Sequence, residues 1–297
     1  MTREHRLRPR RAANRQRENR GELGQNFLKD RQTARRIVAA SGVGGDDLVV
    51  EIGAGGGMLT RELARAARRV TAIECDPYWA AHLRKHCDGA ENVSVVQGDV
   101  LEAKLPDEPF AVVANLPFGI TTPILHRLLD DPEGPLLSAH LVVQKPVALK
   151  HASPTPTTLK TLTWSPWYQF TASLRLPAEV FCPRPSVDAC LMVATKRSPP
   201  LVDARHRHLF RALVRRGFEV PGNVVGKTLR PYFTRTQLRR LAKDNGFSLN
   251  SAPSALTVHQ WSSVFRFMAL TVPREQWPPP GPRAGKKRRR GGRRRLE

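Results

Sequence analysis

The distribution of apolar residues predicts a mixed α/β chain. Between about residues 30 and 195, short runs of β-branched residues alternate with segments whose apolar residues recur at helical spacing. This alternation is typical of a doubly wound sheet, in which helices connect parallel strands. The strands are predicted at 48–52, 70–74, 93–97, 110–114 and 141–144, and the helices at 58–68, 77–86 and 122–129.

Later segments break this alternation. Residues 167–176 and 187–195 both have strand patterns with no helix predicted between them, so we expect an antiparallel pair at one edge of the sheet. Only helical patterns follow Ser198-Pro199-Pro200, which predicts an α/β domain at 21–197 and a small C-terminal helical domain at 198–277. The expected helices cover 204–216, 236–246 and 254–270, with Ser254 as the N-cap of the last.

Positive charge is concentrated at the two ends of the chain. The sequence has 49 Lys and Arg against 26 Asp and Glu, a net charge of +23, of which residues 1–20 supply +6 and residues 283–297 supply +8. Neither end has apolar periodicity, so we predict disordered basic arms at 1–20 and 278–297 that contact phosphate groups. The excess favours nucleic acid over an anionic membrane as partner, although Arg-rich ends can also reflect only a GC-rich genome.

Several classes of protein are disfavoured. The sequence has no run of 18 apolar residues and no apolar signal segment, so we expect a cytoplasmic protein that does not span a membrane. The four cysteines form no CxxC pair, which argues against a metal site. We expect them to be buried, reduced thiols, and they are Cys75, Cys87, Cys182 and Cys190.

A glycine-rich turn follows the first strand and opens the first helix. Gly53, Gly55 and Gly57 would let the backbone turn sharply and approach a ligand closely. The NAD fingerprint would require another glycine at position 58, where this chain has Met58. The observed GxGxG pattern is typical of S-adenosylmethionine enzymes, with a ligand-free glycine turn as the alternative.

Two acidic residues then follow the next two strands. Glu74 ends the second strand about 20 residues after the glycine turn, a spacing that suits a ribose diol. Asp99 follows the third strand and is expected to bind the cofactor adenine. An isolated acid at a strand end is usually a solvated turn or a helix cap. Because the carboxyl ends of parallel strands meet at one edge, the combination predicts a nucleoside site.

The tetrapeptide Asn115-Leu116-Pro117-Phe118 follows the fourth strand and is the candidate catalytic site. The exocyclic amine of adenine is a weak nucleophile because its lone pair is conjugated with the ring. The Asn115 side-chain oxygen and the backbone carbonyl of Leu116 or Pro117 can accept its two hydrogens, and Phe118 can stack on the base. This chemistry needs positioning and no metal. The alternative is an Asn-Pro turn beside a buried aromatic residue.

Together these motifs resemble the rRNA adenine dimethyltransferase superfamily, which includes the erythromycin-resistance (Erm) 23S rRNA methyltransferases and the 16S rRNA dimethylases. The resemblance implies a Rossmann-like S-adenosylmethionine-dependent methyltransferase sheet with a small C-terminal helical domain. It also implies that Gln25, Asn26 and Leu28 contact the cofactor together with Gly53, Gly55, Glu74, Asp99 and Asn115, and that Phe181 lies beside the target base. The matching segments are 24–28 (GQNFL), 51–60 (EIGAGGGMLT), 72–76 (AIECD), 97–100 (QGDV), 115–118 (NLPF) and 181–188 (FCPRPSVD).

Within the superfamily the chain is most similar to the Erm branch. Residues 164–170 (WSPWYQF) resemble a WxPWFEF-type stretch of actinomycete Erm proteins, and Glu179-Val180 stand where the 16S dimethylases usually carry Gly-Ala. The resemblance implies N6 methylation of one adenine in the peptidyl-transferase loop of 23S rRNA, with resistance to macrolides, lincosamides and streptogramin B. We expect a monomer that acts on free or partly assembled 23S rRNA.

Three other functions stay open at this point: a 16S rRNA dimethylase, a non-catalytic nucleic-acid-binding relative, and a DNA adenine methyltransferase. The chain also departs from the family pattern in three places. Pro146 occupies the start of an expected helix, residues 216–222 are less basic than the family's GRGRG-like loop, and Ala189 replaces a common serine.

Overall fold

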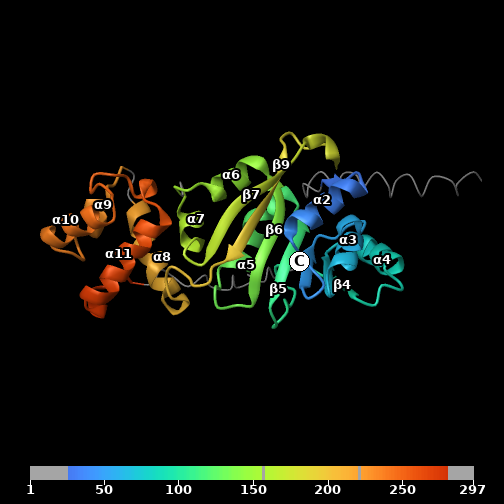
Figure 1. Cartoon of the computed structure of the whole chain (residues 1–297), viewed down its shortest axis with the longest axis horizontal. Helices are drawn as coiled ribbons and strands as arrows, with labels where there is room; N and C mark the ends of the chain where they lie inside the picture. Colours follow the sequence, from blue (N-terminus) through green and yellow to red (C-terminus); the bar gives the residue numbers. More distant parts are fainter. Residues whose placement is uncertain (1–25, 156–157, 220–221, 280–297) are drawn as a thin grey trace, which may run out of the picture.

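The computed structural model describes residues 26–155, 158–219 and 222–279. Its centre is a seven-stranded sheet with the strand order β4-β3-β2-β5-β6-β9-β7 (Figure 1). The first five strands along the chain are parallel, whereas β9 is antiparallel to both β6 and β7. The strands are β2 (Leu48–Ile52), β3 (Arg69–Glu74), β4 (Val93–Gln97), β5 (Phe110–Asn115), β6 (Leu136–Gln144), β7 (Tyr168–Leu176) and β9 (Ala189–Lys196), and β1 (Phe27–Leu28) pairs separately with β8 (Phe181–Cys182).

Helices cover both faces of the sheet. Successive residues of a strand point to opposite faces, so Val49 packs with α2 and α3 while Val50 packs with α5. The helices after β9 form a separate group, at the left of Figure 1. The helices are α2 (Arg31–Ser41), α3 (Met58–Ala66), α4 (Pro77–His86), α5 (Thr121–Leu129), α6 (Lys145–Ala152), α7 (Leu159–Trp164), α8 (Arg207–Phe218), α9 (Val225–Leu229), α10 (Arg235–Asp244) and α11 (Val258–Thr271).

The predicted fold class is confirmed, including the antiparallel pair with β7 at the sheet edge. Strand β6 begins at Leu136, five residues before the predicted start. The prediction began too late because Ser138 and His140 interrupt the apolar run that marked the strand. Helix α6 begins at Lys145 in spite of Pro146, which lies in the first turn, where the missing N–H has no helical partner to lose.

The prediction of Ser254 as an N-cap is wrong. Ser254 lies in a short 3-10 turn over Pro253–Ala255, and α11 begins only at Val258. The cap is Thr257, whose hydroxyl accepts the Gln260 N–H at 3.3 Å while the Gln260 side-chain oxygen accepts the Thr257 N–H at 2.8 Å. This reciprocal pair is a capping box, which satisfies two backbone donors at the helix start.

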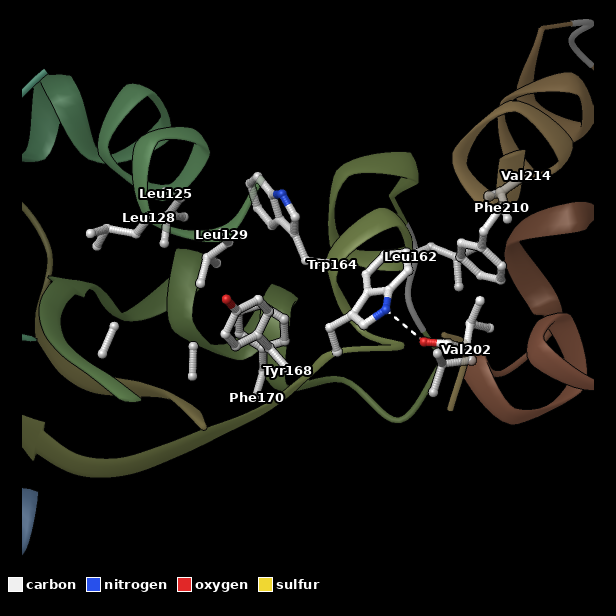
Figure 2. Packing of buried hydrophobic residues seen from close by; sticks show 14 of the residues in the cluster. Leu125, Leu128, Leu129, Leu162, Trp164, Tyr168, Phe170, Val202, Phe210 and Val214 are labelled. Carbon is white, nitrogen blue, oxygen red and sulfur yellow. Dashed lines mark hydrogen bonds between the residues drawn. The ribbon is translucent and has the colours of Figure 1, made fainter. Parts of the chain in front are cut away.

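Buried aromatic residues from the 164–170 stretch connect the sheet to the C-terminal helices (Figure 2). The Trp167 indole N–H donates to the Val202 carbonyl at 2.7 Å, and the ring meets Phe210 of α8 edge-on with 5.7 Å between centroids. The Trp164 indole N–H donates to the Asp130 carboxylate at 2.8 Å. One hydrophobic cluster therefore continues across the predicted boundary at 197–198, although the sheet itself ends at Lys196.

The cysteines differ from expectation. All four are free thiols, but Cys190 alone is buried, while Cys87 is partly exposed and Cys75 and Cys182 are exposed. Among the described residues, no helix combines the length and apolarity needed to cross a membrane. The arm predicted at 1–20, residues 280–297 of the second arm, and Gln25 lie outside the described residues.

Candidate active site

The glycine turn after β2 has the conformation that its sequence predicts. Gly53, Gly55 and Gly57 have φ angles of +70°, +51° and +77°, in the left-handed region that favours glycine. The Gly53 N–H donates to the Ile73 carbonyl at 2.8 Å, so the turn is anchored to the end of β3. A Cβ atom on Gly55 would lie only 2.7 Å from the Phe27 ring, which shows how closely β1 covers the turn.

Glu74 holds the glycine turn in place. Its side chain is buried, with 2% exposed, and one carboxylate oxygen accepts the Gly55 N–H at 2.7 Å. The other oxygen accepts the Asp76 N–H at 2.9 Å, just before α4. A carboxylate that accepts backbone N–H groups from both sides fixes the turn, and it lies at the edge where the sequence predicted a ribose contact.

Glu51 is a second buried acid, one strand away from Glu74. It is 2% exposed, and the Thr60 hydroxyl donates to it at 2.6 Å. Burial raises the pKa of Glu51 to about 8, with a further contribution from the nearby Glu74. The Glu51 carboxyl is therefore predominantly protonated at neutral pH.

This raised pKa predicts how stability depends on pH. A carboxyl whose pKa rises on folding stabilises the fold fully below its unfolded value of 4.5, and this contribution is lost as the pH rises towards 8. Glu51→Gln removes the ionisation, so the free energy of unfolding of the variant relative to wild type should rise by roughly 4 kcal/mol between pH 5 and pH 8. Urea titrations of both proteins across this range measure the difference, and a difference that stays constant with pH would refute the assignment.

Two cavities open at this edge of the sheet. The larger, of about 730 Å³, is mostly apolar and includes Glu51, Leu28 and Trp79 in its wall. The smaller, of about 60 Å³, is lined by Asn26, Glu74 and Asp99 among others. Three residues line both cavities, namely Phe27, Gly53 and Asn115. Asp99 uses one carboxylate oxygen to accept the Leu101 N–H at 2.9 Å, so part of its role is to cap a turn.

Asn115 lies at the junction of the two cavities and presents an acceptor. Its amide nitrogen donates to the Asn26 carbonyl at 2.7 Å, which ties the end of β5 to the residue just before β1. Its Oδ1 atom is buried and has no hydrogen-bond partner among the described residues. A buried carbonyl oxygen without a donor is costly, so a hydrogen-bond donor that reached this atom would be stabilised there.

The three residues after Asn115 differ in what they can contribute to the site. The Pro117 carbonyl accepts the Ile120 N–H at 3.1 Å, in the turn that opens α5. This contact favours the Leu116 carbonyl as the second acceptor, while the Leu116 side chain, 1% exposed, is part of the core. Pro117 lines the smaller cavity, whereas the half-buried Phe118 packs against the core and is not among the residues that line either cavity.

Comparison with known proteins identifies the family of this chain. The sequence matches the ribosomal RNA adenine dimethylases over residues 16–270. The chain belongs to the ribosomal RNA adenine dimethylase family. This membership makes it an S-adenosylmethionine-dependent rRNA adenine methyltransferase, as its motifs predicted.

The names of relatives within the dimethylase family indicate more than one function. The mycinamicin-resistance protein MyrB of Micromonospora griseorubida is 37% identical over 83% of this chain and 78% of its own length. The ribosomal RNA small subunit methyltransferase A of Geobacillus thermodenitrificans is 38% identical over 66% of this chain and 71% of its own. The crystal structure of the 23S rRNA methyltransferase ErmE aligns with a TM-score of 0.75 at 31% identity, covering 82% of this chain and 100% of that chain.

Phe181 and Leu28, two further predicted site residues, are buried between β8 and β1. Phe181 is fully buried and pairs with Leu28 between β8 and β1, where both pack in the cluster that covers one face of the sheet. A contact between Phe181 and a base would require the ring to be uncovered, so its role beside the target stays a prediction. Leu28 is 7% exposed and lines the larger cavity.

Sequence reasoning missed several residues that line the candidate site, among them Phe27, Glu51, Trp79 and Cys182. Phe27 stands between two predicted cofactor contacts, so its position in the GQNFL segment was a usable signal. Trp79 reaches the site from α4, with its ring 5.5 Å from Phe27 between centroids. Its sequence position inside an amphipathic helix gave no indication of this.

Proposed function

We propose that this protein transfers methyl from S-adenosylmethionine to the N6 amine of one adenine in the peptidyl-transferase loop of 23S rRNA. The observation that carries the proposal is the unsatisfied Oδ1 atom of Asn115, buried where the two cavities meet. The exocyclic amine of adenine has two hydrogens, which the Asn115 oxygen and the Leu116 carbonyl would accept. Both contacts draw the nitrogen towards a tetrahedral form and free its lone pair for attack.

The larger cavity has the volume of a small-ligand site, and the smaller one shares three wall residues with it. From the wall of the smaller cavity, Glu74 and Asp99 would contact the ribose and adenine of the cofactor, with Asn26 and Leu28 at the margin. Gly53 and Gly55 would lie beneath its methionine part. When bound, the cofactor would supply an electrophilic methyl group on a sulfonium sulfur, which is a good leaving group. The chain's own contribution is to position the two reactants and exclude water between them.

The choice of 23S rRNA rests on the ErmE alignment and on the 164–170 stretch. The alignment covers the whole ErmE chain, so it includes the C-terminal helices as well as the sheet. Trp164, Trp167 and Tyr168 are all buried at the junction that orients those helices (Figure 2). We further propose that the protein acts as a monomer in the cytoplasm on free or partly assembled rRNA, with its basic arms on phosphate groups.

A second candidate is dimethylation of 16S rRNA, which the small-subunit methyltransferase of Geobacillus thermodenitrificans supports at 38% identity. Resistance separates the two candidates in cells. A macrolide-susceptible bacterium that expresses this chain should grow at erythromycin concentrations that stop the same strain expressing Asn115→Ala. Equal susceptibility of both strains, with both proteins present in immunoblots, would reject the 23S proposal.

A further inference from the structure

Outside the two arms, the net positive charge comes from residues 198–277, which contain the C-terminal helices. Residues 21–197 have 19 Lys and Arg against 19 Asp and Glu, so this part has no net charge. Residues 198–277 have 13 Lys and Arg against 4 Asp and Glu, a net charge of +9. Because affinity for a polyanion follows the neutralisation of its phosphates, the helical part is where the folded chain should hold RNA.

This part also contains a cavity of about 500 Å³, which we call the Trp277 pocket. It lies between the start of α8 and the chain after α11, and its volume is in the range of small-ligand sites. The Trp277 indole N–H donates to the Val272 carbonyl at 2.8 Å, which fixes the plane of the ring. The pocket is lined by Arg205, His206, Leu209, Arg274 and Trp277.

The lining has the chemistry of an unpaired nucleotide site. The rings of His206 and Trp277 lie 6.4 Å apart between centroids at an angle of 68°, and the Arg274 guanidinium lies 6.0 Å from the Trp277 centroid. A base can stack on an indole or a guanidinium plane, and guanidinium groups bind phosphate.

The acids near the pocket do not block phosphate. Arg205 pairs with Asp203 at 2.8 Å, but both side chains are exposed, and an exposed ion pair contributes little to stability. Phosphate can therefore replace Asp203 at small cost. Glu275, next to Arg274, is also exposed to solvent.

We propose that the Trp277 pocket binds an unpaired nucleotide of the RNA substrate, as an anchor separate from the target adenine. This inference rests on the proposed function, because it assumes an RNA substrate. The Trp277 pocket would then be a second RNA contact, in addition to the site of methylation.

The Trp277 pocket and the methylation site lie near opposite ends of the strands of the sheet. Asn115 pairs with Val142, near the end of β6. In contrast, Thr195 near the end of β9 pairs with Ser138, near the start of β6, and Arg207 next to the pocket forms ion pairs with Asp131 and Glu133 in the turn before β6. Nine residues of β6 span ~30 Å, so an RNA that contacts both sites has to extend over a comparable distance.

This separation makes the test depend on RNA length. Fluorescence anisotropy would measure the affinity of the full chain for two probes, the 23S target hairpin alone and a 23S fragment extended by its flanking single-stranded segments. Trp277→Ala should weaken binding of the long probe by about 5-fold to 100-fold, as expected for loss of one stacked base. It should leave the hairpin affinity and the methylation of the hairpin unchanged, and Trp277→Phe should retain most of the affinity for the long probe.

Removing one positive charge inside or outside the pocket gives a matched comparison. Arg274→Ala should reduce the slope of log affinity against log salt for the long probe by about one, whereas Lys104→Ala, a cation of the neutral domain, should not change it. Unchanged affinity of Trp277→Ala for the long probe, or equal weakening on both probes, would overturn the proposal. A wild-type chain that methylates neither probe would instead count against the proposed function, because probe binding is measured separately.

Discussion

Replacing Asn115 with alanine is expected to reduce kcat for methyl transfer by roughly 10²-fold to 10³-fold, the range found when one preorganised polar contact to a reacting group is removed. The physical reason is that Asn115 supplies a buried acceptor without a partner among the described residues, at the junction of the two cavities. Without it, the amine loses one of the two contacts that make it nucleophilic. Single-turnover methylation of 23S rRNA measures the chemical step directly.

The control must separate chemistry from folding. Asn92 also uses its amide nitrogen for backbone carbonyls, those of Ala64 and Ala67, but it is remote from the site. Asn92→Ala should therefore destabilise the protein without a comparable loss of kcat. If the Asn115→Ala variant, saturated with RNA and cofactor, kept a kcat within a few-fold of wild type, the assigned role of Asn115 would be wrong.

Replacing Gly55 with alanine is expected to weaken S-adenosylmethionine binding at least ~10-fold, which corresponds to about 1.4 kcal/mol. The new Cβ would lie 2.7 Å from the Phe27 ring and force it to move at the boundary that both cavities share. Alanine at a φ of +51° adds backbone strain of about 1–2 kcal/mol. Isothermal titration with the cofactor measures the loss of affinity.

Gly42 provides a matched control for the backbone strain of alanine at a positive φ angle. It has a φ of +69°, and a Cβ atom there would meet nothing within 4 Å. Gly42→Ala should thus reduce the free energy of unfolding by a similar amount and leave cofactor affinity unchanged. Equal affinity losses in the two variants would show that strain alone explains the result, and that the contact with Phe27 has no role.

The sheet was predictable because its signals are local. The β-branched runs, the glycine turn and the acids at strand ends each occupy a few consecutive residues, and the rule that parallel strands end at one edge assembles them into a site. The same reasoning selected Asn115 from its place after a strand and from its chemistry, and the structure places this residue in the wall of both cavities.

The features that were missed depend on contacts between distant segments. The tie from Asn115 to Asn26 joins residues 89 positions apart, and it brings Phe27 over the glycine turn. The burial of Phe181 likewise follows from its pairing with β1. The error at Ser254 has a local cause, because both Ser254 and Thr257 are good caps and only the geometry of the Pro253 turn decides between them.

The most direct test of the account is to incubate the purified chain with labelled S-adenosylmethionine and protein-free 23S and 16S rRNA, and then to map the modified adenines by primer extension and mass spectrometry. We expect N6 methylation of one adenine in the peptidyl-transferase loop of 23S rRNA, and a strong reduction of its rate by Asn115→Ala. Methylation of 16S rRNA alone, or of neither RNA by a protein that binds the cofactor, would contradict it.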